Sequence, residues 1–378
     1  MKHILHINSY YITNKLHSEL VKSLDKKSLK QTVFIPVCSN KLINANNIES
    51  LKFGKLIYSK SFNSLTRLIW PVKMLQIWAS FQKTVKKIER PNIIHAHSLI
   101  VNGLIAWLYS SRYNIPFSVS VRNTDINVFL KRSHIFRKLA EKILLKADSI
   151  MFLSPAYRDV HLKRIISDEL FTKILPKTYI IPNGIDSFWI ENSSNKTTFI
   201  TKNICRILFS GRIDGNKNLK GVIEACNILT SKNQNIEIVV VGDGPLLNDL
   251  KKKNYSFKVT FHGYINEKEK LKKIYRSCQI LVVPSFHETF GLIYPEAMTQ
   301  GLPVIYSNNQ GIDGYFPDGH VGYAVSPKNS NDIAKKIEMI ITDYKRISKN
   351  ANYESQKFSW DLVSNYVIKM YKASITSQ

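Results

Sequence analysis

Two glutamates, Glu288 and Glu296, bracket a short turn that contains Gly291. The chain runs from Val283 to Val304 as Val-Pro-Ser-Phe-His-Glu-Thr-Phe-Gly-Leu-Ile-Tyr-Pro-Glu-Ala-Met-Thr-Gln-Gly-Leu-Pro-Val. A strand that ends in a turn before a helix N-terminus is a ready site for phosphate. A neighbouring carboxylate can accept hydrogen bonds from sugar hydroxyl groups. The spacing therefore predicts a site that holds a phosphate and a sugar close together, as a nucleotide sugar requires.

Two cations upstream could complete such a site. Gly211 and Arg212 follow an expected strand, and Lys217 comes shortly before the helical stretch 219–230. Arginine offers a planar fork and lysine a point charge, which together suit a diphosphate leaving group whose charge grows as its bond to the sugar breaks. Alone, such a pair is more often solvated surface charge. The glutamate segment downstream favours the diphosphate interpretation.

The segment 283–304 resembles the donor-binding signature of the family 4 retaining glycosyltransferases, which have the GT-B fold. The resemblance implies that Arg212 and Lys217 bind the diphosphate. It also implies that Glu296 accepts hydrogen bonds from the ribose and that Glu288 faces the transferred sugar. The backbone N–H groups expected to hold the phosphate or the sugar are those of Phe290, Gly291 and Leu292.

Two further loops are expected near the donor. The stretch Gly242-Asp-Gly244-Pro closes a strand and opens a helix, and glycines there allow a tight turn and close approach of the backbone. A plain strand–helix connector explains this stretch equally well. Tyr264 and Ile265 lie in a loop similar to the family segment that flanks the nucleotide base.

The first half of the chain carries weaker motifs. Ile181-Pro-Asn-Gly-Ile-Asp186 matches the element that closes the first domain in the family, and His95-Ala-His97 ends a strand. The resemblance puts His97 on the acceptor side, although a histidine at such a position is more often structural. A metal site would need a third ligand, and none is evident at a helpful spacing. We therefore expect no metal ion and no cofactor; the nucleoside-diphosphate sugar is a co-substrate.

This chain departs from the family pattern at two places. Arg122-Asn-Thr-Asp125 stands where the family commonly has His-Gly-x-Asp, so Arg122 and Asp125 are the catalytic candidates of this half. Arginine cannot act as a base, but Arg122 could stabilise the leaving phosphate or the sugar hydroxyls, or bind an acidic acceptor. After the first strand, Asn8 and Tyr10 stand in the place of a Gly-Gly turn and are acceptor-side candidates.

Strand-like and helical stretches alternate twice along the chain, which predicts an α/β fold with two parallel sheets. We expect an N-terminal Rossmann-like acceptor domain over residues 1–186, a polar linker over 187–203 and a C-terminal donor domain over 204–359. The resemblance implies that the two domains face each other across a cleft. It also implies that the last helix, within 360–378, crosses back to the first domain.

The chain has 378 residues and a formal net charge of +26, with the excess mainly in its first half. This charge favours anionic partners. Basic and aromatic residues alternate over 65–90, and a basic cluster covers 131–146. Such segments can lie on an anionic bilayer, but a core-packed helix with a solvated basic face explains them equally well. No apolar run approaches the ~20 residues of a membrane-spanning helix. The four scattered cysteines favour reduced thiols and a cytoplasmic protein, with peripheral contact at the inner face of the plasma membrane as the bilayer hypothesis.

The predicted activity is transfer of a hexose, with retention, from a nucleoside-diphosphate sugar to a hydroxyl of a glycan or lipid-linked acceptor in surface-polysaccharide synthesis. The alternatives are a nucleotide-sugar epimerase or phosphorylase, which share the fold, and a catalytically inactive scaffold. A nucleic-acid-binding protein is favoured by charge alone, without a binding signature, so we expect no nucleic-acid partner.

Overall fold

The computed structural model describes residues 3–66, 68–194 and 204–376, which divide into two compact units. Within these residues, unit 1 comprises 3–66, 68–153, 158–184 and 360–376, and unit 2 comprises 154–157, 185–194 and 204–359. The boundary expected after Asp186 therefore lies two residues beyond the observed one, after Gly184. Each unit contains a parallel sheet with helices, so the predicted fold class is confirmed.

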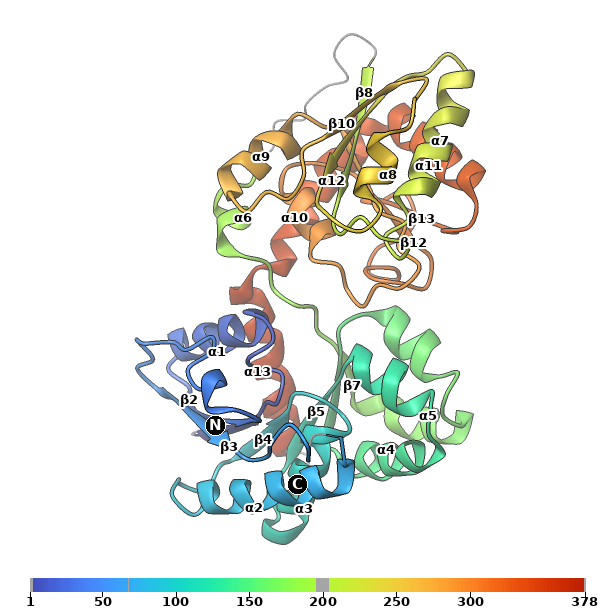
Figure 1. The fold of residues 1–378 in the computed structure, drawn as a ribbon. Coiled ribbons are helices and arrows are strands. Elements are labelled where there is room, and N and C mark those ends of the chain that lie inside the picture. The colour runs from blue at the N-terminus through green and yellow to red at the C-terminus, as the bar shows by residue number, and fades with distance from the viewer. Residues whose placement is uncertain (1–2, 67, 195–203, 377–378) are drawn as a thin grey trace. The chain divides into compact units, whose positions relative to one another are not determined.

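Unit 1 is built on a sheet that, among the described residues, has seven parallel strands in the order β3-β2-β1-β4-β5-β6-β7 (Figure 1). The strands are β1 (His3–Ile7), β2 (Lys30–Val37), β3 (Gly54–Lys60), β4 (Ile93–Ala96), β5 (Phe117–Val121), β6 (Ser149–Phe152) and β7 (Thr178–Ile180). The longer helices are α1 (Leu16–Lys26), α2 (Trp70–Val85), α3 (Val101–Tyr113), α4 (His134–Lys146), α5 (Asp168–Ile174) and α13 (Trp360–Thr376). The strand order reverses between β1 and β4, and ligands of open α/β sheets bind where loops diverge at such a point.

Unit 2 repeats this plan with the strand order β10-β9-β8-β11-β12-β13 (Figure 1). Its strands are β8 (Ile204–Ser210), β9 (Asn235–Val241), β10 (Lys258–Phe261), β11 (Ile280–Val282), β12 (Val304–Ser307) and β13 (Gly322–Val325). Its helices are α6 (Ser187–Glu191), α7 (Leu219–Ser231), α8 (Leu247–Lys251), α9 (Lys268–Arg276), α10 (Ile293–Thr299), α11 (Ser330–Thr342) and α12 (Tyr344–Ser355). The reversal here lies between β8 and β11, directly before the two predicted donor segments.

The C-terminal helix α13 belongs to unit 1, as expected. Small polar residues join it to the unit: Ser23 Oγ donates to the Trp360 carbonyl at 2.9 Å, and the Ser374 hydroxyl bonds Ser149 at 2.8 Å. Gly184 allows the close packing of the Trp360 ring, because a Cβ atom at Gly184 would lie 2.4 Å from that ring. The glycine of the Pro-Asn-Gly element is therefore required by packing.

The structure also corrects several boundaries. The expected linker 187–203 begins with helix α6, which is capped when the Asp186 side chain accepts from the Phe188 N–H at 3.0 Å, and its described part belongs to unit 2. The remainder of that linker, 195–203, lies outside the described residues. The helix expected from residue 65 begins only at Trp70, because Pro71 suits the first turn of a helix. The sequence motifs did not predict β13, α11 and α12.

No helix among the described residues is both long and apolar enough to cross a lipid bilayer.

Candidate active site

Asn216 joins the two loops that meet at the strand-order reversal of unit 2. Its side-chain amide donates to the His287 carbonyl and accepts from the His287 N–H, both at 3.0 Å. Its backbone carbonyl accepts from the Phe286 N–H at 2.8 Å. The loops after β8 and β11 are therefore held together by one residue that sequence reasoning missed. Its only signal was an asparagine in a glycine-containing loop.

Lys217 and Glu288 form an ion pair across these loops, with side chains only 22% and 15% exposed. The Lys217 N–H is held by the Asp214 carboxylate at 3.0 Å, and the Glu288 N–H by the Gln310 side-chain oxygen at 3.0 Å. The structure thus brings together two residues that the sequence predicted independently. Without a ligand, each neutralises the other.

Arg212 lies at a more open position than Lys217. Its side chain is 71% exposed, and its nearest acidic partner is Asp214 at 3.4 Å. An exposed ion pair of this kind contributes little to stability. The guanidinium is therefore available to a diphosphate at low cost, although Asp214, which sequence reasoning did not single out, competes for it.

The turn before α10 offers backbone donors without acceptors. Among the described residues, the N–H groups of Phe290, Gly291 and Leu292 make no hydrogen bond. The turn is held by the buried Phe290 ring and by Gly291, whose φ of 78° and close contact with the Tyr294 ring exclude a side chain. Unpaired amides at the start of a helix can bind an anion, which is the role predicted for this turn.

Glu296 lies in the first turn of α10 and has no hydrogen-bond partner for its carboxyl group among the described residues. Burial, reinforced by the charge of Asp186 and opposed by Lys268, raises the pKa of Glu296 to about 8. The raised pKa favours the neutral carboxyl group, which can both donate and accept hydrogen bonds. Such a group is suited to bind sugar hydroxyls, because each hydroxyl can also donate and accept a hydrogen bond.

Backbone contacts explain the glycines of the donor loops. A Cβ atom at Gly242 would lie 1.8 Å from the Gly211 carbonyl oxygen, and one at Gly244 would lie 2.4 Å from the Ile213 oxygen. The Gly242 N–H also donates to the Gly263 carbonyl at 2.8 Å. The loops after β8, β9 and β10 therefore pack backbone against backbone. This packing accounts for Gly242 and Gly244 without a ligand, and contact of either with the donor stays a prediction.

The loop after β10 leaves Tyr264 in solvent, with 74% of its surface exposed, while Ile265 is partly buried. An exposed aromatic side chain beside the glycine-rich loops could stack on a nucleotide base. The predicted base contact of these two residues has no further support in the described structure.

In unit 1, Asp125 joins the loops that follow β4 and β5. Its carboxylate accepts from the N–H groups of Leu99 at 2.9 Å, Ile100 at 3.0 Å and Arg122 at 2.9 Å. Burial raises the pKa of Asp125 to about 6, against the lowering effect of these bonds. The prediction of a catalytic contact needs correction, because the carboxylate is wholly buried and both its oxygens hold the backbone. Asp125 is a positioning residue.

Arg122 lies at the same edge and is partly buried. Its Nε donates to the His97 carbonyl at 3.3 Å, and burial lowers the pKa of the guanidinium to about 10. Its terminal nitrogens have no acceptor among the described residues.

The predicted acceptor-side residues differ in accessibility. The side chains of His97 and Asn8 have no exposed surface, whereas Tyr10 is partly exposed. In this ligand-free arrangement neither His97 nor Asn8 has surface open to solvent. Contact of any of the three with the acceptor stays a prediction.

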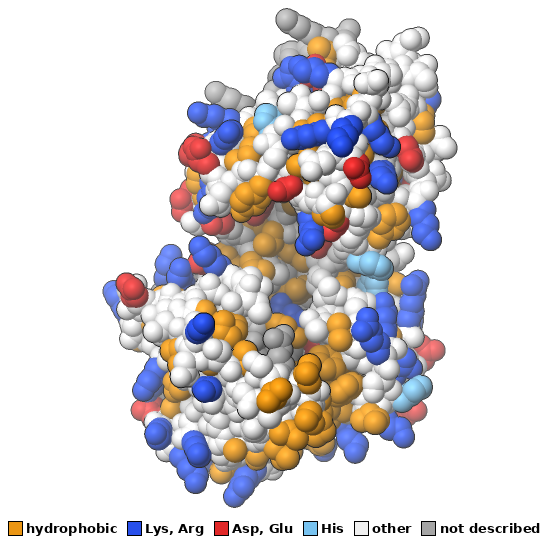
Figure 2. Space-filling view, in the orientation of Figure 1, with side chains coloured by type: hydrophobic (Ala, Val, Ile, Leu, Met, Phe, Trp, Pro, Cys, Tyr) orange, Lys and Arg blue, Asp and Glu red, His pale blue; other side chains and the backbone are white. Residues whose placement is uncertain are grey.

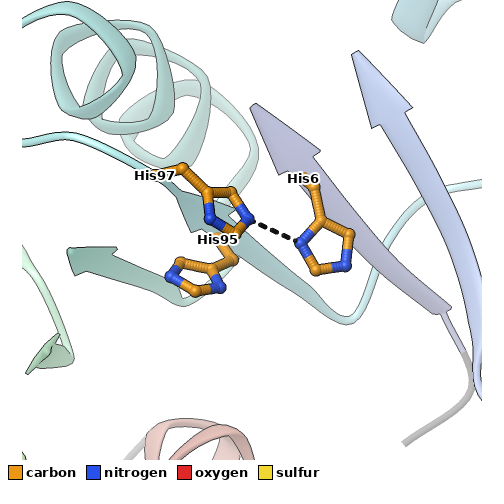
Figure 3. Close-up of side chains that lie close together, drawn as sticks. All are labelled: His6, His95 and His97. Carbon is orange, nitrogen blue, oxygen red and sulfur yellow. Dashed lines mark hydrogen bonds between the residues drawn. The ribbon is translucent and has the colours of Figure 1, made fainter. Parts of the chain in front are cut away.

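His97 instead belongs to a buried histidine cluster with His6 and His95 (Figure 3). His6 Nδ1 lies 3.0 Å from His97 Nε2, and the rings of His95 and His97 stack with centroids 4.0 Å apart. His6 is the third histidine, which the sequence did not reveal; it comes from β1, whose parallel pairing with β4 puts it opposite His95. The spacing along the chain contains no trace of this pairing.

The cluster is hydrogen-bonded rather than open to a metal ion. Both His95 nitrogens are engaged, with Tyr371 at 2.6 Å and Ser120 at 2.8 Å. Because metals bind in the plane of an imidazole ring, the stacked rings of His95 and His97 cannot share one ion without rotating. The expectation that the protein needs no metal ion therefore stays a prediction. A search for bound metal would begin at this histidine cluster.

Comparison with known proteins agrees with this geometry. Residues 18–187 match the family model described as Glycosyltransferase Family 4, and residues 191–357 match Glycosyl transferases group 1. An uncharacterized glycosyltransferase of Methanocaldococcus jannaschii, MJ1607, is 31% identical over 325 residues, which cover 79% of this chain and 81% of the relative.

Solved structures show the same fold. The apo form of the lipopolysaccharide outer core galactosyltransferase WaaB matches with a TM-score of 0.74 at 17% identity, covering 98% of this chain and 99% of the other. The Anabaena protein Alr3699/HepE, solved in complex with UDP-glucose, matches with a TM-score of 0.65 at 17% identity over the same shares.

The buried histidines predict acid lability. Burial lowers the pKa of His6 to about 3 and those of His17, His95 and His97 well below 6.5. Below pH 6.5 the unfolded chain binds protons that the folded chain does not, so each such histidine costs about 1.4 kcal/mol per pH unit. We expect urea unfolding to show this loss between pH 6.5 and 4. The His6→Gln variant should show a slope smaller by one proton. An unchanged slope, or the same change in a variant of the exposed His134, would contradict the assignment.

Glu296 has the opposite pH dependence. A carboxyl group with its pKa raised to about 8 opposes folding as pH rises from about 4.5 to 8, because the folded state disfavours its charged form. We expect Glu296→Gln to match the wild type at pH 5. At pH 8 the variant should be more stable by at least about 1 kcal/mol in chemical unfolding. The exposed Glu191→Gln serves as the control, and equal effects of both variants at pH 8 would refute the raised pKa.

Proposed function

We propose, from the premise that this chain belongs to the family 4 glycosyltransferases, that it moves a sugar from a nucleoside-diphosphate donor to a hydroxyl group of a glycan or lipid-linked acceptor. The observation that carries the donor assignment is the group at the strand-order reversal of unit 2. There the Lys217–Glu288 pair and the unpaired amides of residues 290–292 lie on loops that Asn216 joins, and the unpartnered Glu296 lies in the first turn of the helix that follows.

These groups supply what the transfer needs. The bond between the anomeric carbon and the diphosphate breaks, and a bond to the acceptor oxygen forms. With retention, the acceptor attacks from the face that the diphosphate leaves, and its proton passes to the departing phosphate oxygen. Lys217, Arg212 and the turn amides would stabilise the growing negative charge, so most of the catalysis is positioning and electrostatics. No divalent metal is required in this scheme.

The ligand-free ion pair between Lys217 and Glu288 limits which ligands can bind between the two charges. Lys217 and Glu288 are mostly buried and bonded to each other, so a bare separation would leave two desolvated charges at high cost. A sugar diphosphate can replace both partners at once, because phosphate oxygens accept from Lys217 while a sugar hydroxyl donates to Glu288. The pair therefore favours a ligand that carries phosphate and hydroxyl groups together over free phosphate.

The hexose and the surface-glycan context rest on similar proteins. A lipopolysaccharide galactosyltransferase and a protein bound to UDP-glucose have the same fold. We infer a uridine nucleotide as the first donor to test. An epimerase would act on the donor alone, so product analysis without acceptor separates the two activities.

Replacing Lys217 by Met should weaken donor binding by about tenfold or more, because one charge-assisted hydrogen bond to phosphate is lost. The measurement is the shift of Tm across a panel of UDP, GDP, ADP and dTDP sugars, since a ligand that binds the folded state raises Tm by mass action.

The matched control is Lys220→Met, because Lys220 is exposed and lies three residues along the chain. It should keep the full shift of the wild type. If no nucleotide sugar raises Tm, or if both lysine variants respond alike, the donor site lies elsewhere. Conversion of the donor without acceptor would favour the epimerase.

We also propose peripheral contact with an anionic bilayer through unit 1. Side chains before and along the start of α2 are strongly exposed, with Leu65 at 78%, Leu68 at 84% and Leu75 at 69%, and Ile135 of α4 is 79% exposed. The two helices are in contact through the rings of Trp70 and Phe136, whose centroids lie 4.9 Å apart. Figure 2 shows hydrophobic side chains gathered on this face of unit 1, with Lys and Arg side chains around them. The exposed cations of the neighbouring segment are Lys131, Arg132, Lys138 and Lys142.

An apolar patch with a basic margin suits a negatively charged bilayer, which can take the leucines and pair with the cations. We expect the chain to float with phosphatidylglycerol vesicles and to be released by high salt. The double variant Leu68→Ser and Leu75→Ser should reduce recovery in the floating fraction severalfold. Tyr353→Ser, which removes an exposed aromatic side chain of unit 2, should not. Flotation that is absent, or insensitive to the leucines, would refute this contact.

A further inference from the structure

The carboxyl edge of the unit 1 sheet holds buried polar side-chain atoms without hydrogen-bond partners among the described residues. Among the described residues, Asn8 Nδ2, Asn102 Nδ2 and His97 Nδ1 are buried and unpaired. They lie where β1 and β4 diverge, since Asn8 and His97 directly follow these two strands and the Ser9 N–H bonds the Asn102 side chain at 3.2 Å. Buried donors in native structures are nearly always paired. Several unpaired polar atoms at an edge of the sheet where such folds bind ligands indicate that a ligand supplies their hydrogen-bond partners.

Arg122 lies at this edge without a carboxylate partner. Its backbone N–H is held by Asp125 and its Nε by the His97 carbonyl, so the base of the side chain has a defined position. Asp125 is the adjacent carboxylate, but its two oxygens already accept three backbone N–H groups. The two terminal nitrogens of Arg122 therefore have no hydrogen-bond acceptor among the described residues. A desolvated cation without a paired anion is costly, and a bound anion would remove that cost.

His17 extends the same group from α1. Its side chain is 7% exposed, has no hydrogen-bond partner among the described residues, and contacts the His97 ring edge-on at 5.3 Å. His17 and Arg122 line one small cavity, and Asn183 lies at its wall. Burial and the charge of Arg122 lower the pKa of His17, so its imidazole is neutral and can donate one N–H.

Asp125 is the acidic group whose charge acts on Arg122, and its two oxygens already accept backbone N–H groups. The other groups near this cavity add no negative charge, because burial lowers the pKa values of His6, His17, His95 and His97 and raises that of Tyr10. A bound neutral hydroxyl would give the guanidinium no hydrogen-bonded anion. Phosphate and carboxylate match the planar fork of arginine with two parallel hydrogen bonds.

We propose that Arg122 and His17 form a binding site for an anionic oxygen group, a phosphate or a carboxylate, carried by the acceptor. The proposal rests on the proposed function, since it assigns an acceptor to unit 1 of a glycosyltransferase. Arg122 would then select among acceptors, because the preferred acceptor carries a negative charge near the hydroxyl that is glycosylated.

The test measures binding of two probes, inorganic phosphate and D-glucuronate, to the full chain by calorimetry at constant ionic strength. Saturating UDP fills the donor site of unit 2 in one arm and is omitted in the other. The variants are Arg122→Met, Arg122→Lys and His17→Phe. Arg164→Met is the matched control, because Arg164 is exposed and makes no side-chain bond among the described residues.

We expect Arg122→Met to weaken one or both probes by about tenfold or more in the presence of UDP, because a charged hydrogen-bonding partner is lost. Arg122→Lys should recover part of the affinity, His17→Phe should reduce it, and Arg164→Met should leave it unchanged. Loss for phosphate alone identifies a phosphorylated acceptor, and loss for glucuronate alone identifies an acidic sugar.

If neither probe distinguishes Arg122→Met from Arg164→Met, the proposal is overturned. Failure of UDP to bind would refute the donor site instead, and the arm without UDP would still report on Arg122. Circular dichroism and the urea midpoint of Arg122→Lys establish that a loss of binding is not a loss of folding.

Discussion

The proposed donor site of unit 2 depends on one interaction, the mostly buried ion pair between Lys217 and Glu288. The pair connects the loops after β8 and β11, and Asn216, Asp214 and Gln310 hold the backbones from which the two side chains project. Because separated charges in such a place are costly, the ion pair and these hydrogen bonds fix the spacing of the two loops. The unpaired amides before α10 lie on the second of these loops.

In unit 1 the loops at the edge of the sheet are joined by a different interaction. There a buried carboxylate, Asp125, accepts three backbone N–H groups and joins the loops after β4 and β5. Since the oxygens of that carboxylate accept backbone amides, Asp125 acts on Arg122 through its charge and forms no direct ion pair with the guanidinium. The donor edge of unit 2 is therefore nearly neutral without ligand, whereas the corresponding edge of unit 1 has an excess of donors. The difference gives the two units different preferences for ligands.

Residues close together along the chain were predicted well. The strand–turn–helix at 283–304, the cations at 212 and 217, and the glycines at 211 and 242 all lie in loops at the carboxyl ends of parallel strands, as expected. The predictions failed where the environment decides a role. Asp125 and His97 were expected at a ligand and are wholly buried, because the sequence does not show which side of a sheet edge the neighbouring helices cover. Ser187–Glu191 was expected as linker and is a helix, capped by Asp186, which was expected to close the first domain.

By itself, the sequence determined the α/β class, the two parallel sheets and the family, because these follow from local periodicity and from motifs contiguous along the chain. The docking of the last helix on the first unit was implied by the family resemblance. Only the tertiary structure decided that Lys217 is paired with Glu288, that His6 meets His95 and His97, and that Arg122 has no carboxylate of its own. Such facts depend on strand register and on which polar groups remain unpaired after packing. Both are set by contacts between residues far apart in the chain.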